Sequence, residues 1–175
     1  ADYLYREPEV IRRTVSDWAT MTFTWGKLPG TESQETDEGI DVADGERVTS
    51  SAWTASFLLA PDYRDQFLQQ LSKDIIPAGV FSGDVSAVLI PQQISPPQAL
   101  ETGRWQVDLM ATRVVFDSSN PAGTTIPFNR RLYLRAVAPP QSPLKEQSTL
   151  QQQVIYQALE SGLQIEEIRP IRTKE

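Results

Sequence analysis

The sequence contains 175 residues with a net charge of −7, and 39% of its residues are hydrophobic and 22% are charged. This balance is typical of a globular chain that can bury a core, and the negative charge disfavours nucleic acid as a partner. The chain has no Cys and no His, which excludes disulfides, thiolate metal sites, Ser-His-Asp catalysis and histidine-ligated zinc.

The first half of the chain is predicted to contain three helices. Apolar residues recur at helical spacing over residues 8–25, where Pro8 fits the first turn and Gly26 ends the helix. A second helix is expected over residues 49–60, and a third begins at Pro61.

Residues 30–46, between the first two helices, are expected to form an exposed acidic loop, because they are rich in Asp and Glu and poor in large apolar side chains. Asp37, Asp41 and Asp44 resemble part of a calcium-binding loop. However, the acidic ligands at every second position and the bidentate Glu at the twelfth position of such a loop are absent. A solvated surface loop is therefore the favoured interpretation, and metal binding stays open as the alternative.

After the helices, the hydrophobic pattern changes to the two-residue period of β-strands. A short strand is expected over residues 85–91, and longer ones over 105–116 and 126–138 should pair as an antiparallel hairpin. Residues 148–161 fit either a helix or an extension of a strand, and residues 163–171 fit a last strand.

The order of these elements, with helices first and strands later, is typical of the α+β class. We therefore expect one domain over residues 1–175, in which N-terminal helices pack on a curved, mostly antiparallel, cone-like sheet. The sequence shows no internal repeat that would argue for another architecture.

A first candidate site is the group Arg130, Arg131, Tyr133 and Arg135 on one predicted strand. Strand alternation places Arg131, Tyr133 and Arg135 on one face and Arg130 on the other. Arg and Tyr are enriched at protein interfaces, so this group is a candidate interface for an acidic partner protein. The alternative is an exposed sheet face whose charges prevent aggregation.

A second candidate site is a pocket on the concave side of the sheet, with Trp105 and Asp108 as its candidate residues. A buried Asp108 could act as a base if burial raised its pKa. No His can partner this carboxylate, and the alternative is a structural Asp108 that is exposed or hydrogen-bonded.

Several segments, in this order, resemble a known family. They are VIRRTVSDW at 10–18, the stretch from SSAW at 50–53 to Tyr63, GRWQVDL at 103–109, RRLYLR at 130–135 and SGLQI at 161–165. This order, with three helices followed by long curved strands, resembles that of the cone-shaped fold of the nuclear-transport-factor-like superfamily. Within that superfamily, the chain resembles the bitopic inner-membrane assembly factor of bacterial type IV secretion and conjugation systems.

The resemblance implies a cytoplasmic tail, one membrane span and an extracytoplasmic domain that self-associates and holds other channel components. We therefore expect a protein-interaction scaffold on the extracytoplasmic side of a bacterial membrane, with other proteins and a second copy of itself as partners. It is expected to be no enzyme and to use no cofactor. Because the chain begins with Ala1 and not Met, we expect that an upstream part carrying the anchor was removed.

Two alternatives to this role remain. One is a small-molecule binding domain or simple enzyme that uses the concave pocket of the same fold. The other is an adaptor of the same kind in the cytoplasm.

Overall fold

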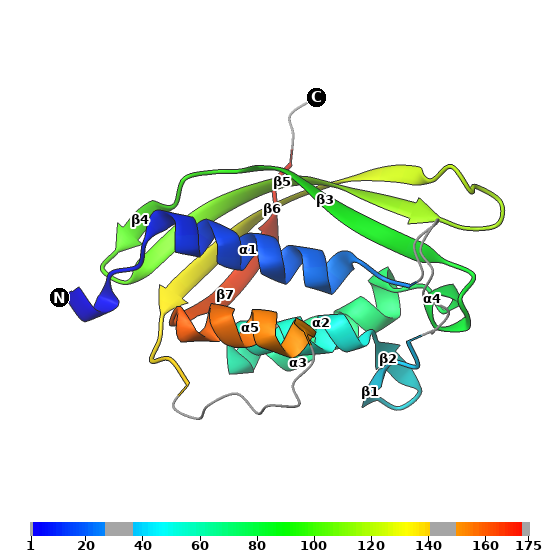
Figure 1. Ribbon diagram of the computed structural model, residues 1–175, viewed down its shortest axis with the longest axis horizontal. Coiled ribbons are helices and arrows are strands. Elements are labelled where there is room, and N and C mark those ends of the chain that lie inside the picture. Colours follow the sequence, from blue (N-terminus) through cyan, green and yellow to red (C-terminus); the bar gives the residue numbers. More distant parts are fainter. Residues whose placement is uncertain (1, 27–36, 141–149, 173–175) are drawn as a thin grey trace.

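Helices lie along one face of a five-stranded antiparallel sheet (Figure 1). The computed structural model of the protein describes residues 2–26, 37–140 and 150–172. We call the side of the sheet that faces the helices the inner face and the opposite side the outer face. The predicted α+β class, with N-terminal helices packed on an antiparallel sheet, is confirmed.

The helical layer is built from the first half of the chain and from one later helix. Short turns of 3₁₀, π or α type connect the longer helices. The helices are α1 (Pro8–Phe23), α2 (Ser50–Ala55), α3 (Pro61–Gln70) and α5 (Leu150–Glu160), and the short turns are Asp2–Leu4, Ser56–Leu58, Leu71–Ile75 and α4 (Gly79–Ser82).

Two predicted helices are shorter in the structure than expected. The helix predicted over residues 8–25 ends at Phe23, because the backbone of Trp25 exchanges two hydrogen bonds with Ala87 at the start of the sheet. The helix predicted over residues 49–60 stops being α-helical after Ala55. The N–H of Ala60 instead donates to the carbonyl of Ile165 at 2.8 Å.

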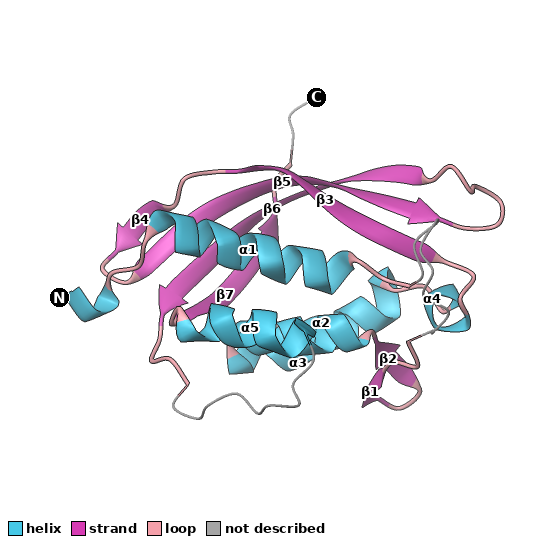
Figure 2. Cartoon of the chain, viewed as in Figure 1, coloured by secondary structure: helices cyan, strands magenta, loops and turns pink. Residues whose placement is uncertain are grey.

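The sheet has the strand order β3-β5-β6-β7 (Figure 2). β4 pairs with the N-terminal end of β5, which extends beyond the pairing with β3. Its two long central strands form the hairpin that the sequence predicts. A β-bulge interrupts the pairing of β3 with β5 and another that of β6 with β7, and such bulges bend the strands. The strands are β3 (Ser86–Ile94), β4 (Gln98–Glu101), β5 (Arg104–Phe116), β6 (Thr124–Ala136) and β7 (Leu163–Pro170).

The prediction of an acidic loop over residues 30–46 is wrong for part of this range. Strands β1 (Ile40–Ala43) and β2 (Glu46–Val48) pair as a small antiparallel hairpin, with Gly45 in its turn at a φ of +73°. Residues 30–36 of the predicted loop lie outside the described residues. The ambiguity at residues 148–161 is resolved as the helix α5, although residues 148 and 149 also lie outside the description.

The core lies between the helices and the inner face of the sheet, as the sequence periods predict. Trp18 of α1 is completely buried, and the ring of Phe23 packs against that of Phe128 on β6 with centroids 4.4 Å apart. On the strands, alternate residues are buried, including Val107, Leu109, Leu132 and Leu134. The intervening side chains are therefore presented on the outer face.

Candidate functional site

The outer face of the sheet presents Arg131, Tyr133 and Arg135 of β6. Their neighbours Leu132 and Leu134 are buried under the helices, so the alternation of the strand turns the three polar side chains outward. The structure thus places three of the four residues predicted as an interface on the same face of the sheet. Arg130 lies on the inner face.

Arg131 is held by a carboxylate on the neighbouring strand. The register pairs Arg131 with Asp108 of β5, and the guanidinium donates from Nε to Oδ1 at 2.8 Å and from Nη2 to Oδ2 at 3.1 Å. This bidentate hydrogen bond, together with the charge of Asp108, raises the pKa of Arg131. Both side chains stay partly exposed, at 39% and 31%, so the pair is accessible to solvent and to a partner.

The last strand adds a second arginine beside Tyr133. Arg169 of β7 is the register partner of Arg131, and its guanidinium lies 5.2 Å from the centre of the Tyr133 ring. It also makes a bidentate ion pair with Glu167, with Nε and Nη2 at 2.8 and 3.0 Å from the carboxylate oxygens. The Tyr133 ring is therefore stacked against a cation that is already oriented.

These side chains border a surface hollow of about 300 Å³. We call it the arginine hollow. Its lining consists of Arg131, Tyr133, Arg169, Pro170, Ile171 and Arg172. Three guanidiniums line it, and among the described residues Arg131 pairs with the carboxylate of Asp108 and Arg169 with that of Glu167. Planar guanidiniums with an adjacent tyrosine are suited to bind carboxylates of a protein partner.

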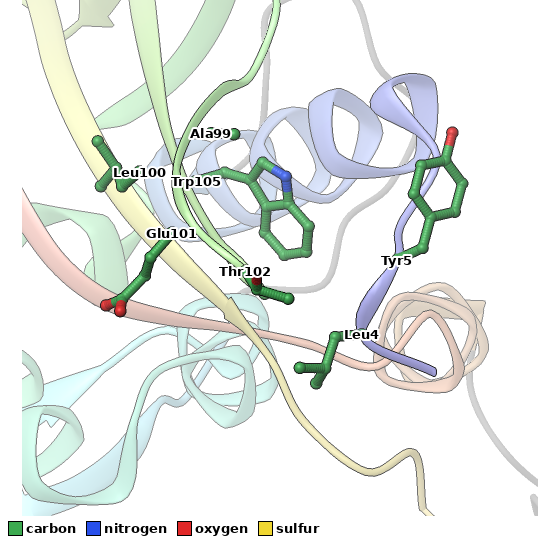
Figure 3. Close-up of a pocket in the computed structure, with 8 residues that line it drawn as sticks. Leu4, Tyr5, Ala99, Leu100, Glu101, Thr102 and Trp105 are labelled. Atoms are coloured by element: carbon green, nitrogen blue, oxygen red, sulfur yellow. The ribbon is translucent and has the colours of Figure 1, made fainter. Parts of the chain in front are cut away.

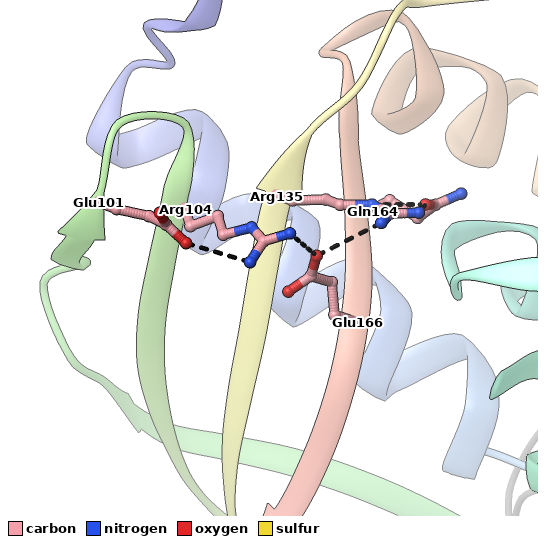
Figure 4. A network of polar contacts seen from close by, with 5 residues as sticks. All are labelled: Glu101, Arg104, Arg135, Gln164 and Glu166. Atoms are coloured by element: carbon pink, nitrogen blue, oxygen red, sulfur yellow. Dashed lines mark hydrogen bonds and ion pairs between the residues drawn. The ribbon is translucent and has the colours of Figure 1, made fainter. Parts of the chain in front are cut away.

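Arg135 belongs to a separate polar network at the C-terminal end of β6 (Figure 4). Its guanidinium lies 3.5 Å from Glu166 and donates two hydrogen bonds to the amide oxygen of Gln164. Glu166 also pairs with Arg104 at 3.3 Å, and Arg104 pairs with Glu101 at 3.1 Å. This network ties β5, β6 and β7 together and separates Arg135 from the arginine hollow.

The two residues predicted for a concave pocket, Trp105 and Asp108, are not brought together. Their positions on β5 have opposite parity, so Trp105 points to the inner face while Asp108 is bound to Arg131 on the outer face. Trp105 lines a groove of about 490 Å³ between the N-terminal turn and β4 (Figure 3). Leu4, Tyr5 and Leu100 border the same groove.

Within the described part of the acidic stretch, Asp37 has a structural role. One of its carboxylate oxygens accepts a hydrogen bond from the Ser50 N–H at 2.7 Å, and the other accepts from the Ser50 hydroxyl at 2.7 Å and the Gly39 N–H at 2.9 Å. It therefore anchors the start of α2. In the described ranges, no group of three or more acidic side chains is arranged to hold a metal ion.

Sequence reasoning did not find the contribution of β7 to the outer face. Glu166, Glu167 and Arg169 are visible in the sequence as a charged run, but the bulge opposite Tyr133 and Leu134 breaks the simple alternation there. The pairing of β7 with β6 is what brings Arg169 to Arg131. In the sequence, this charged run is the signal that could have predicted a polar outer face on β7.

The described residues include no helix that is both long and apolar enough to cross a membrane. No protein-family model and no curated protein sequence matches the chain.

Solved structures, by contrast, match this fold over nearly the whole chain. The soluble domain of TrwG from the type IV secretion machinery of Bartonella grahamii has a TM-score of 0.58 and 13% identity, covering 97% of this chain and 99% of that one. The periplasmic domain of DotI has a TM-score of 0.56 and 14% identity, covering 95% and 98%. An IcmL-like type IV secretion system protein from Legionella pneumophila has a TM-score of 0.57 and 12% identity, covering 96% of both chains.

At these identities the matches establish a common fold, and they confirm the predicted resemblance at that level. The chain has the cone-shaped α+β fold that is found in the soluble and periplasmic domains of type IV secretion proteins.

Proposed function

We propose that this chain is the extracytoplasmic domain of a membrane-anchored component of a bacterial type IV secretion or conjugation machinery, where it acts as a protein-interaction scaffold without enzymatic activity. The observation that carries the proposal is the end-to-end match with the soluble domain of TrwG, which covers 97% of this chain and 99% of that one. The matching domain of DotI is periplasmic, which supports the extracytoplasmic location.

The arginine hollow is the surface that we assign to partner binding. Among the described residues, its three guanidiniums outnumber the two carboxylates paired with them, so an acidic segment of a partner can add hydrogen bonds without displacing every existing pair. Tyr133 supplies an aromatic surface of the kind that dominates interface energetics. A partner protein or a second copy of the chain could provide the acidic segment.

Site-specific photocrosslinking in the native host tests the scaffold role. A photoreactive amino acid replaces Tyr133 in the full-length protein, and the matched control carries it at Ser119, which is exposed in the turn between β5 and β6. We expect adducts with secretion-machinery components, or with a second copy, from position 133 only. Equal adducts from both positions, or none from position 133, would contradict the assignment of this surface.

Protease accessibility tests the location independently. In spheroplasts of the native host, added protease is expected to degrade this domain while cytoplasmic markers survive. Protection until the inner membrane is lysed would show a cytoplasmic domain and overturn the proposed location.

A further inference from the structure

Exposed apolar side chains gather where the N-terminal turn meets β4. Seven large apolar side chains are well exposed among the described residues, and three of them lie there, namely Tyr3, Tyr5 and Leu100. The exposed fractions of the two tyrosines are 78% and 61%. The other four are dispersed over the short turn after α2, β3, β6 and α5. A local cluster of this kind marks a surface that contacts something else.

The groove of about 490 Å³ lies within this cluster. Figure 3 shows the Trp105 ring on the side of β5 that faces the N-terminal segment with Leu4 and Tyr5, and the ring is partly buried. The turn between β4 and β5 packs against the same segment, since a Cβ on Gly103 would lie 3.5 Å from the Leu4 side chain. Two distant parts of the chain therefore build one mostly apolar groove.

Arg6 holds the N-terminal turn in place. Within the turn, its Nη1 donates to the carbonyls of Tyr3 and Tyr5 at 2.9 and 2.8 Å. Toward the body of the domain, its Nε donates to the carbonyl of Gly162 at 3.1 Å and its Nη2 to that of Val137 at 3.2 Å. The exposed rings are thus carried by a segment that is fixed to the domain, so contact through these rings would orient the whole domain.

The charge of the groove does not favour an ionic ligand. Among the described lining residues, Glu101 alone carries a charge, and it pairs with Arg104 at 3.1 Å. The arginine hollow, by contrast, presents three guanidiniums. Tyrosine and tryptophan rings with little net charge around them are typical of the boundary between water and lipid headgroups, where the ring is apolar and its O–H or N–H stays hydrated.

We propose that the groove and the two tyrosines beside it rest on the lipid surface of the membrane, with the rings of Tyr3, Tyr5 and Trp105 at the level of the headgroups. This inference rests on the proposed function, in which the domain lies outside a membrane to which the protein is anchored. An anchor holds the domain near the bilayer at a high effective concentration, so weak contact by a few side chains is enough to orient it.

A second copy of the chain is a less suitable occupant of this surface. Aromatic side chains bury about 150–250 Å² each when fully covered. Three partly exposed rings therefore offer less than the roughly 800 Å² per partner of a standard protein interface. A bilayer requires no complementary shape, and its contact with a protein scales with the apolar area buried in it.

Vesicles of zwitterionic phosphatidylcholine test the lipid contact. The chain has no Cys, so Thr102→Cys at the groove and Ser119→Cys in the exposed turn between β5 and β6 each take a single environment-sensitive fluorophore. A histidine tag at the N-terminus binds a nickel-chelating lipid, which replaces the anchor. We expect the emission at position 102 to shift to the blue and to be quenched by lipids with brominated acyl chains. The emission at position 119 should do neither.

The double variant Tyr3→Ser/Tyr5→Ser is expected to abolish the blue shift at position 102. It removes two exposed side chains but keeps the backbone carbonyls that Arg6 binds, so the fold should be retained. The matched control Ile90→Ser/Leu150→Ser removes two exposed apolar side chains from β3 and α5. This control should keep the wild-type shift.

No blue shift at position 102, equal shifts at both positions, or an unchanged shift in the tyrosine variant would overturn the proposal. A shift that requires anionic phosphatidylglycerol would show adsorption by charge and would also overturn it. So would a shift that appears without vesicles as the protein concentration rises, because a second copy would then cover the groove. Protease accessibility in spheroplasts decides the location of the domain separately, so a failure of lipid contact is distinguishable from a failure of the proposed function.

Discussion

Arg64 is packed between two aromatic rings at the junction of α2 and α3. Its guanidinium carbon lies 4.4 Å from the ring centre of Trp53 and 4.2 Å from that of Phe57, and Nε donates to the Ser56 hydroxyl at 2.9 Å. The side chain is only 18% exposed. Burial lowers its pKa, so the two rings interact with a largely desolvated cation.

Replacement of Arg64 should therefore destabilise the fold. We expect Arg64→Gln to lower the free energy of unfolding by about 1–2 kcal/mol, the range of a desolvated cation–π contact. The control is Arg169→Gln, because Arg169 also stacks on a ring but is 60% exposed. Urea denaturation of both variants measures the difference, and equal losses would show that desolvation adds nothing at Arg64.

Also at the scale of single residues, the sequence predicted which side chains share a face but not what they touch. Alternation separated Arg130 from Arg131 and Tyr133, as the structure confirms. It gave no sign that Asp108 would pair with Arg131, because that contact depends on the cross-strand register.

At the scale of elements, the junction between α5 and β7 depends on Gly162. Its φ is +71°, and a Cβ on this residue would lie 2.8 Å from the carbonyl oxygen of Val137 and 2.5 Å from a guanidinium nitrogen of Arg6. The Gly162 carbonyl accepts hydrogen bonds from the Val137 N–H and from Arg6 Nε. A side chain at position 162 would therefore be disfavoured twice, by the left-handed backbone and by steric overlap with Val137 and Arg6.

A comparison of Gly162 with Gly45 separates the cost of a left-handed backbone from the cost of steric crowding. Gly45 has a nearly identical φ of +73° but nothing within 4 Å of its would-be Cβ. Gly45→Ala is expected to lower the free energy of unfolding by about 1–2 kcal/mol, and Gly162→Ala by clearly more. Chemical denaturation of both variants gives the comparison, and a loss at Gly162 no larger than at Gly45 would refute the crowding argument.

Long periodic elements were predictable, and short ones were not. Residues 105–116 and 126–138 alternate over enough positions to predict a strand pair, and α1 repeats its apolar face over sixteen residues. Strands β1, β2 and β4 have three or four residues each. So few positions cannot establish a period, and only pairing with a neighbour defines such strands.

At the scale of the whole molecule, the absence of His determines how stability depends on pH. No side chain of the sequence has an ordinary pKa between 5 and 8. The free energy of unfolding is therefore expected to change by less than about 0.5 kcal/mol between pH 6 and 7.5, measured by urea denaturation. A larger change would mean that a carboxylate has a pKa shifted into this range.

Stability should begin to fall only in acid, and Asp117 contributes to that fall. Hydrogen bonds from the Ser119 hydroxyl and the Asn120 N–H lower its pKa from the ordinary 3.8. A depressed pKa gives stability that is complete above 3.8 and is lost as pH falls through the lower value of the folded state. Asp117→Asn should accordingly differ most from the wild type near neutral pH, and the difference should begin to shrink below pH 3.8 and disappear below the folded-state pKa of Asp117.

The sequence by itself determined the class of the long elements, their buried faces and the kinds of chemistry that the chain cannot perform. Those properties are local or compositional: a period is read within one segment, and the absence of His and Cys needs no coordinates. Tertiary structure alone decided which residues meet across strands. It places Arg169 against Tyr133 and Glu166 between Arg104 and Arg135. It also makes Trp18 and Arg130 line one cavity. These contacts join residues far apart in the chain, and they depend on strand order, register and a bulge, which no local pattern encodes.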